Sequence, residues 1–276
     1  MPAGDSIQEG PRPIRTNIAA MRFLRSLCVW LGIGAATVGF GLPAILAAFL
    51  PPRGDWFLRF ARGWARTILA FSRVAVAVCH AERLDRRRSF VVVANHESYA
   101  DVLVLLATLP LQVRFLAKRS IFRVPILGWS IRAAGFVPVD RGDSARSLAT
   151  VETALQRLRS GRSLVVFPEE TRTATGDLSP FKKGAALLAL KAGLPLLPIG
   201  IAGSRRILPR GAWNMTPGRV VLAVGEPVDV AGRSVKEARA VTGDLRDHVA
   251  RLRDEAAREL AADILRRENG CRLPPI

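Results

Sequence analysis

The sequence predicts an α/β domain with a largely parallel mixed sheet flanked by helices, preceded by an N-terminal membrane-associated helical segment. Two observations predict this fold class. From Val74 onward, short β-branched runs alternate with helical stretches, which is typical of a parallel sheet with crossover helices. Before Val74, a segment without any charged residue runs from Ser26 to Pro52 and is long enough to cross a bilayer.

The chain of 276 residues divides into three parts by composition. Residues 1–20 are polar and rich in proline and glycine without periodicity, so we expect a flexible tail. Residues 21–73 form the membrane-associated helical segment, and residues 74–276 form the α/β domain. With 49% hydrophobic residues, the chain is able to bury one sizeable core.

The apolar segment is not a uniform membrane-spanning helix, because it contains residues that bend or divide helices. These residues are Gly32, Gly34, Gly39, Gly41 and Pro43. Arginines stand at both ends of the segment, so the positive-inside rule gives it no direction. One transmembrane helix and a hairpin that enters and leaves on the same side remain equally open. A cleavable signal peptide is not favoured, because no small-residue cleavage site precedes the domain.

The next helix carries two contrasting faces. Asp55 is placed to cap a helix from Trp56 to about Arg73. One stripe of this helix is Arg59, Arg62, Arg66 and Arg73, and the opposite stripe is Phe57, Phe60, Trp64, Ile68 and Phe71. Such a helix is suited to lie among anionic headgroups. An ordinary helix that packs its aromatic residues on the core has the same pattern, so that interpretation also stands.

The α/β domain is predicted from strand runs and helical runs. The predicted strands are Val74–Val78, Phe90–Ala94, Gln112–Ala117, Gly135–Arg141, Ser163–Phe167, Pro195–Ile201 and Val220–Val224. The predicted helices are Ser98–Leu109, Ser144–Ser160 and Phe181–Ala192. Near the C-terminus, Ser234 and Glu237 form a capping-box pattern ahead of an amphipathic helix, for which we expect a packing role.

Charge and composition restrict the class of partner. A formal net charge of +18 indicates an anionic partner, which is a phospholipid surface, nucleic acid or an acidic small molecule. The apolar segment favours an anionic phospholipid membrane. Aromatic residues make up only 7% of the chain and supply few stacking surfaces for bases, so we expect no nucleic-acid partner. The three cysteines have no metal-ligand spacing, so we expect no metal.

His96 is the strongest candidate for chemistry. It follows the apolar run Val91–Ala94 at the beginning of a predicted helix, where ligands bind in open α/β sheets. Asp101 lies five residues later, a spacing that lets its carboxylate reach back to the imidazole and fix its tautomer. A histidine oriented by a carboxylate acts as a general base toward an alcohol. By contrast, His80 has no acidic partner at useful spacing, and His248 lies amid the charges of the last helix.

Three further blocks follow in the sequence. The block Phe167–Arg172 ends an apolar strand, so it displays Glu169 and Arg172 at the same sheet edge as His96. The other two blocks are Gly135–Arg141 and the apolar Leu194–Ile199. Taken alone, the charged block is typical of an ordinary solvated turn.

The four blocks together, in this order, resemble the phospholipid acyltransferase family that includes the 1-acylglycerol-3-phosphate acyltransferases. The resemblance covers Val74 to Val230 and includes Phe115–Ser120, Pro125, Gly128 and Trp129. The positions that match within the blocks are Asn95, His96, Asp101, Gly135, Arg141, Phe167, Pro168, Glu169, Thr171, Arg172 and Pro198. One departure is Glu170, which stands where the family usually has glycine and adds negative charge beside the expected phosphate site.

The resemblance implies that residues 74–276 are an acyltransferase catalytic domain with His96 and Asp101 as catalytic residues. His96 would deprotonate the hydroxyl of a lysophospholipid, lysophosphatidic acid above all, which attacks the acyl thioester directly. The residues agree, because no serine or cysteine beside a base offers a covalent nucleophile. Acyl-CoA or acyl carrier protein would be the co-substrate, with no cofactor. Backbone amides near the helix entrance are the expected oxyanion donors.

The acceptor phosphate requires cations, and arginine binds phosphate oxygens in bidentate fashion. Arg172 is the first choice, Arg141 and Lys118 come next, and Lys182 and Lys183 are weaker choices. By resemblance, Glu169 belongs to the acceptor-side motif and holds Arg172 or a hydroxyl in place. Thr171 and Asn95 are the remaining substrate-binding residues that the resemblance implies.

Three alternatives remain. The acceptor could be another lysolipid such as lyso-ornithine lipid, which only Glu170 supports. The chain could be a non-catalytic peripheral membrane protein that docks through the arginine-bearing helix. A nucleic-acid binder accounts for the charge but not for residues 26–52. For the enzyme, we expect the inner (cytoplasmic) membrane with the active site facing the cytoplasm, where thioester donors are made.

Overall fold

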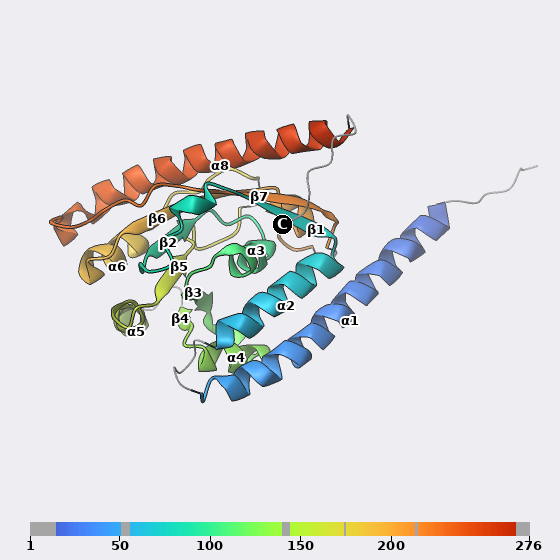
Figure 1. Ribbon diagram of the computed structural model, residues 1–276, viewed down its shortest axis with the longest axis horizontal. Helices are drawn as coiled ribbons and strands as arrows, with labels where there is room; N and C mark the ends of the chain where they lie inside the picture. The colour runs from blue at the N-terminus through green and yellow to red at the C-terminus, as the bar shows by residue number, and fades with distance from the viewer. Residues whose placement is uncertain (1–14, 51–55, 140–143, 174, 213–214, 269–276) are drawn as a thin grey trace, which may run out of the picture.

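The computed structural model describes residues 15–50, 56–139, 144–173, 175–212 and 215–268. At its centre is a seven-stranded sheet in the order β1-β7-β6-β2-β5-β3-β4 (Figure 1). Neighbouring strands are parallel except β6 and β7, which are antiparallel. The predicted largely parallel mixed sheet is therefore confirmed.

The strands lie where the β-branched runs predict them. They are β1 (Val74–Cys79), β2 (Val91–Ala94), β3 (Val113–Lys118), β4 (Val137–Val139), β5 (Ser163–Val166), β6 (Leu196–Ala202) and β7 (Gly218–Val224). The central strands β2, β5 and β6 are buried along their whole length. Both of their faces are covered by helices, which explains why they read as continuous apolar runs.

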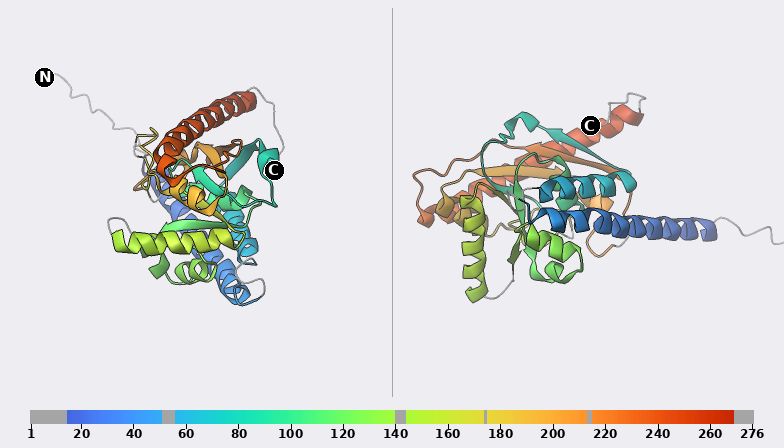
Figure 2. Two further views of the ribbon diagram at one scale, coloured as in Figure 1. Left: turned by 90° about the vertical axis from the view of Figure 1, so that its left-hand side faces the viewer. Right: turned by 60° about the horizontal axis from the view of Figure 1, so that its bottom comes forward.

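The helices form a layer on each face of the sheet (Figure 2). They are α1 (Arg15–Ala47), α2 (Phe57–Phe71), α3 (Ala100–Thr108), α4 (Leu127–Ala133), α5 (Ser144–Arg159), α6 (Gly184–Ala192), α7 (Ser204–Ile207) and α8 (Ala238–Glu268), with 3-10 helices η1 (Ala81–Arg83), η2 (Arg119–Arg123) and η3 (Val235–Glu237). Val92 and Ala94 of β2 face the core that contains α1, α2 and α3, whereas Val91 and Val93 face the core that contains α5, α6 and α8.

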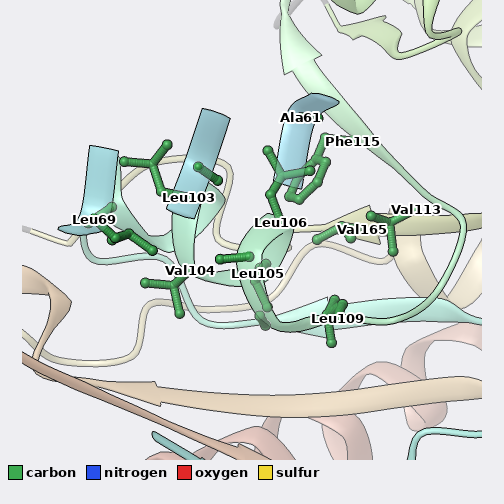
Figure 3. Close-up of a cluster of buried hydrophobic side chains, with 14 of the residues drawn as sticks. Ala61, Leu69, Leu103, Val104, Leu105, Leu106, Leu109, Val113, Phe115 and Val165 are labelled. Atoms are coloured by element: carbon green, nitrogen blue, oxygen red, sulfur yellow. The ribbon is translucent and has the colours of Figure 1, made fainter. Parts of the chain in front are cut away.

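Helix α3 lies between α2 and the sheet (Figure 3). Its residues Leu103–Leu106 are buried with Ala61 and Leu69 of α2 on one side and Phe115 and Val165 of the sheet on the other. This packing fixes the position of the first turn of α3, which carries Asp101.

The N-terminal segment forms two antiparallel helices, α1 and α2, that pack side by side (Figure 1). Helix α1 runs continuously through Pro43, so neither this proline nor the glycines divide it. Gly32 instead permits close packing, because a Cβ there would lie 2.8 Å from the ring of Phe71. Helix α1 begins at Arg15, inside the range predicted as a tail. Residues 1–14 and the predicted cap Asp55 lie outside the described residues.

Only one face of α1 is buried. Ser26, Val29, Ala36 and Ala44 are buried at helical spacing, whereas large apolar side chains elsewhere on the helix are exposed. The segment Phe23–Ala47 is long and apolar enough to cross a membrane, judged by length and composition.

Two arginines of the predicted cationic stripe bind protein. Arg62 Nη2 donates to the carbonyl oxygens of Leu109 (3.0 Å) and Leu111 (2.8 Å), and Arg66 Nη2 donates to that of Ala107 (3.2 Å). The carbonyls of Ala107 and Leu109 lie at the C-terminal end of α3, where carbonyls lack helical partners and the helix dipole is negative, and Leu111 follows that end. Arg62 and Arg66 therefore fasten α2 to α3 and the residues after it, while on the opposite stripe Phe57 and Ile68 are buried in the core.

The C-terminal prediction is confirmed. The Ser234 hydroxyl accepts from the Lys236 amide, and Glu237 accepts from the Ser234 amide at 2.6 Å, which completes the capping box. Helix α8 follows and buries Leu245 and Val249 on the sheet. The short helix α4 is not among the predicted elements.

Candidate active site

A histidine–aspartate pair lies at the carboxyl end of β2. His96 Nδ1 is 2.8 Å from Asp101 Oδ2, so the contact that the spacing predicts is present. The backbone amides of Glu97 and Ser98 also donate to Oδ2, each at 2.8 Å, and Asp101 is fully buried. The carboxylate is thus fixed by three donors when Nδ1 carries the proton, and Nε2 is left as the basic atom.

The same two amides are also candidates for binding the oxyanion that forms during acyl transfer. Glu97 and Ser98 lie at the helix entrance, where the sequence predicts oxyanion donors. Both of their N–H groups donate to Asp101, so each already has a hydrogen-bond acceptor other than an oxyanion.

A stacking contact also holds the ring face of the His96 imidazole. It stacks on Phe167, with ring centroids 4.1 Å apart and an interplanar angle of 19°. The side chain of His96 is 14% exposed, and it lines a cavity of about 800 Å³. The orientation of the ring is therefore set by one hydrogen bond and one stacking contact.

Glu169 holds two backbone amides and the Ser179 hydroxyl rather than Arg172, so the hydroxyl alternative of the sequence prediction is the one present. Its Oε1 accepts from the backbone amide of His96 (2.7 Å), and its Oε2 accepts from that of Ser179 (2.9 Å). Burial raises the pKa of Glu169, while these two backbone hydrogen bonds act in the opposite direction. We call residues 95–99, between β2 and α3, the catalytic loop. Glu169 therefore connects the catalytic loop to the segment that follows β5.

Asn95 is also placed in the protein interior. It is 1% exposed, its amide nitrogen donates to the carbonyl of Ile201 (2.9 Å), and its oxygen accepts from the Ile201 amide (2.7 Å). Asn95 is not among the cavity-lining residues. This placement joins the end of β2 to β6 and gives Asn95 a structural contact in place of the implied substrate contact.

Cationic side chains gather at the cavity. Arg172, Lys118 and Thr171, three of the implied substrate-binding residues, line it together with Lys182. The guanidinium of Arg172 lies 3.6 Å from the ring centroid of Tyr99. Lys183 is exposed and does not line the cavity. Arg141 lies outside the described residues.

Arg210 is a cavity residue that the sequence analysis did not single out. It follows β6, lines the cavity, and donates to the backbone carbonyl of Arg172 at 3.4 Å. It lies 38 residues beyond Arg172 in the sequence, outside all four blocks. No local signal could therefore have identified it.

Most of the remaining lining of the cavity is apolar. Its walls come from α1, α2, α3, β3, α4, α5 and α6. Phe136 contacts Phe57 and Phe115 along this wall, at centroid distances of 5.8 and 5.5 Å. The histidine and the cations therefore share one space with a wall suited to hydrocarbon.

Glu97 is a second residue beside the site that the sequence analysis missed. It is 9% exposed and accepts from the Asn95 amide at 3.3 Å. Burial and then the neighbouring carboxylate of Asp101 raise the pKa of Glu97 to about 7, against the opposing charges of Arg253 and Arg205. Its position directly after His96 was the only signal available.

Glu170 is exposed at the cavity and has a φ of 59°. This is the left-handed region, which favours glycine. The backbone therefore explains why the family usually has glycine at this position, and Glu170 adopts the same conformation with a side chain.

The prediction that His80 lacks an acidic partner is wrong. His80 Nε2 lies 2.6 Å from Glu255 of α8, and Nδ1 lies 3.5 Å from Glu82. Glu255 is 175 residues away in the sequence, so local spacing could not reveal it. Within the described ranges, no group of three or more His, Cys, Asp or Glu side chains is arranged to hold a metal ion.

Comparisons with known proteins find acyltransferases. A family model described as Acyltransferase matches residues 75–202. A chloroplastic 1-acyl-sn-glycerol-3-phosphate acyltransferase of Brassica napus is 35% identical over 50% of this chain and 40% of its own length. The corresponding Arabidopsis thaliana protein is 32% identical over 73% of this chain and 57% of its own length. The chain thus spans about half the length of these curated relatives.

A solved structure extends the likeness to the fold. The 1-acyl-sn-glycerophosphate (LPA) acyltransferase PlsC of Thermotoga maritima is 28% identical, with a TM-score of 0.75. The match covers 86% of this chain and 96% of that one. The chain is thus similar to acyltransferases in sequence over residues 75–202 and to the PlsC structure in fold.

Proposed function

We propose that this protein is an O-acyltransferase that moves an acyl group from a thioester to the sn-2 hydroxyl of 1-acyl-sn-glycerol 3-phosphate, giving phosphatidic acid for phospholipid synthesis. The observation that carries the proposal is the carboxylate-held imidazole of His96 beside the cations of an otherwise apolar cavity. The named activities of the plant relatives and of the Thermotoga protein support the same acceptor.

His96 is the general base of the proposed reaction. With the Nδ1 proton donated to Asp101, Nε2 accepts the proton of the acceptor hydroxyl. The hydroxyl oxygen then bonds to the thioester carbonyl carbon, the C–S bond breaks, and the imidazolium returns its proton to the departing thiolate. The buried carboxylate of Asp101 stabilises the imidazolium while it exists.

Direct transfer is favoured over an acyl-enzyme. Among the described residues, the hydrogen-bond partner of the His96 ring is Asp101, and no serine or cysteine donates to Nε2. A covalent mechanism needs such a nucleophile within hydrogen-bond reach of the base. Donor and acceptor would therefore occupy the cavity together.

The acceptor phosphate would bind at the cationic end of the cavity. Arg172 is the central group, because its stacking on Tyr99 holds its guanidinium at the cavity. Lys118, Lys182 and Arg210 line the same cavity and add positive charge. Arg141 remains a predicted ligand of the phosphate.

The hydrocarbon of the substrates would lie against the apolar wall. Acyl chains need such a surface, and α1 and α2 supply part of it through residues such as Phe40 and Trp64. Acyl-CoA and acyl carrier protein share the thioester, and the positive charge of the chain suits either acidic donor. The chemistry requires no cofactor.

Membrane attachment follows from the distribution of exposed apolar side chains. Among the described residues, most large exposed apolar side chains lie on α1 or directly after it, and Trp129 is exposed on α4, which packs on α1. The Ser130 hydroxyl lies 3.2 Å from the Gly41 carbonyl at that junction. Such a surface suits a bilayer rich in anionic phospholipid, with the active site on the cytoplasmic side of the inner membrane where thioesters are made.

Acyl transfer by the purified protein in detergent micelles tests this proposal. Acyl-CoA and acyl carrier protein thioesters would be offered as donors, and lysophosphatidic acid and lyso-ornithine lipid as acceptors. We expect labelled phosphatidic acid, with lyso-ornithine lipid used at least about tenfold less efficiently because it cannot satisfy the phosphate site. If lyso-ornithine lipid alone were acylated, the assignment of lysophosphatidic acid as the acceptor would be wrong. Glu170 would then be implicated in the choice of acceptor.

A further inference from the structure

The segment that carries Arg172 is bonded directly to the catalytic histidine. We call residues 171–173 and 175–179 the Arg172 loop. The Thr173 amide donates to the carbonyl of His96 at 3.1 Å. In the other direction, Glu169 links the amides of His96 and Ser179. Backbone hydrogen bonds therefore join the Arg172 loop to the residue that carries the catalytic imidazole.

Three arginines from outside the four sequence blocks hold this loop from its other side. Arg205 of α7 donates through Nη1 to the carbonyl of Thr175. On α8, Arg253 Nη1 donates to the carbonyl of Gly176 (3.3 Å), and Arg246 Nη2 donates to that of Leu178 (3.4 Å). Guanidinium groups donating to carbonyls form charge-assisted hydrogen bonds, which are stronger than neutral ones.

Gly176 is adapted to the approach of Arg205. Its φ is +99°, a conformation that side chains rarely adopt, and a Cβ there would lie only 2.7 Å from Arg205 Nη1. The Gly176 amide donates to the Thr173 hydroxyl at 3.0 Å, which closes the loop on itself. The glycine therefore leaves the space in which the arginine lies.

The charges of Arg205 and Arg253 also act on the catalytic loop. Both oppose the effect of burial on Glu97, the residue that follows His96. The carboxyl groups of Asp101 and Glu169 influence Glu97 in the opposite direction. The two arginines thus donate to carbonyls of the Arg172 loop and also act electrostatically on Glu97, the residue after His96.

We propose that Arg253 and Arg205 are positioning residues that lock the Arg172 loop against the catalytic loop, so that Arg172 is already in place when the acceptor phosphate arrives. The proposal rests on the proposed function, in which Arg172 binds that phosphate. Loss of the lock would make acceptor binding order the loop, which weakens binding. The donor does not require that ordering step.

Steady-state kinetics of Arg253→Met provide the test, with Arg251→Met as the matched control. Arg251 is an exposed arginine of the same helix and makes none of the contacts described above. We expect Arg253→Met to raise the KM for lysophosphatidic acid about 5- to 20-fold while kcat and the donor KM change less than about threefold. Arg251→Met should leave all three constants unchanged.

A double-mutant cycle with Arg172→Ala separates positioning from general destabilisation. If Arg253 acts through Arg172, adding Arg253→Met to Arg172→Ala should change kcat/KM by less than about twofold. Multiplicative losses in the double variant, or equal losses for donor and acceptor, would overturn the proposal. If Arg253→Met does not fold, Arg253→Lys keeps the charge but loses the fork of donors and should still raise the acceptor KM.

Hydrogen exchange of the backbone amides measures the order of the Arg172 loop in the absence of any acceptor. Peptides covering residues 171–179 should exchange faster in Arg253→Met than in the wild type or in Arg251→Met. Unchanged exchange would overturn the lock even in an active enzyme. Failure of the wild type to acylate lysophosphatidic acid would instead refute the proposed function, while faster exchange would still support the lock.

Discussion

Helices α1 and α8 have nearly the same length, 33 and 31 residues, and lie on opposite sides of one sheet (Figure 1). Helix α1 exposes large apolar side chains along its described length, including Leu31 (65%) and Leu46 (71%). Helix α8 exposes mainly charged residues, and its large exposed apolar residues, Ile264 and Leu265, lie near its C-terminal end. Both helices pack one face on the protein, so they differ in the side chains that their outer faces expose.

This contrast gives the two sides of the sheet different tasks. The α1 side contributes to the apolar wall of the cavity and exposes large apolar side chains, which our proposal assigns to lipid. The α8 side supplies Arg246 and Arg253, two of the arginines that hold the Arg172 loop, and its outer face is mainly charged. The His96–Asp101 pair lies where both sides meet, at the end of β2.

Among the changes that test this contrast, the largest expected effect is at α1. Leu31→Glu combined with Leu46→Glu should weaken binding to anionic phospholipid vesicles at least about tenfold, because two exposed leucines would no longer enter the bilayer. Vesicle sedimentation measures this change. The matched control is Ile264→Glu combined with Leu265→Glu on α8, which should leave binding unchanged. Equal losses from both pairs would contradict the assignment of the lipid face.

A smaller effect concerns Glu97, which faces the charges of the α8 side. Its pKa is about 7 in the folded protein against an ordinary value of 4.5. Below pH 4.5 the carboxyl is protonated in both states and the shift costs nothing. As pH rises toward 7, the folded state binds more protons than the unfolded state, so stability falls, and above 7 the full cost is present.

Glu97→Gln removes this cost. At pH 8 the variant should exceed the wild type in free energy of unfolding by about 1–3 kcal/mol, and the advantage should disappear by about pH 4.5. Urea unfolding across this pH range measures both. A variant that is less stable than the wild type at pH 8 would show that Glu97 is needed as a carboxylate by the arginines of the α8 side.

The smallest expected effect concerns Glu170 at the cavity. Its backbone has a φ of 59°, so Glu170→Gly should raise the free energy of unfolding by up to about 1 kcal/mol through relief of strain. Glu170→Gln keeps the strained backbone and should leave stability unchanged. A gain in Glu170→Gln as large as in Glu170→Gly would assign the effect to the charge rather than to the backbone.

The sequence was most informative where a signal is local. The strands could be predicted because buried β-branched runs are contiguous, and the contact between His96 and Asp101 could be predicted because both lie at one strand–helix junction. Helix α4 was missed because it spans only seven residues between Pro125 and Gly135.

Partners that lie far apart in the sequence could not be predicted. Asn95 binds Ile201 across 106 residues, and His80 binds Glu255 across 175. The arginine stripe of α2 shows a related limit, because headgroups and the carbonyls at the end of a helix both attract cations. The pattern alone did not indicate that Arg62 and Arg66 would bind the carbonyls of α3 and the residues that follow it.

The most direct test of the proposed chemistry is His96→Ala, assayed beside the wild type for acyl transfer from a thioester to lysophosphatidic acid. Thermal unfolding of both proteins would show that the variant folds. Removal of the general base predicts a loss in kcat of at least about 100-fold, and up to about 10,000-fold. A folded variant that transfers acyl groups as fast as the wild type would contradict the assignment of His96 as the base.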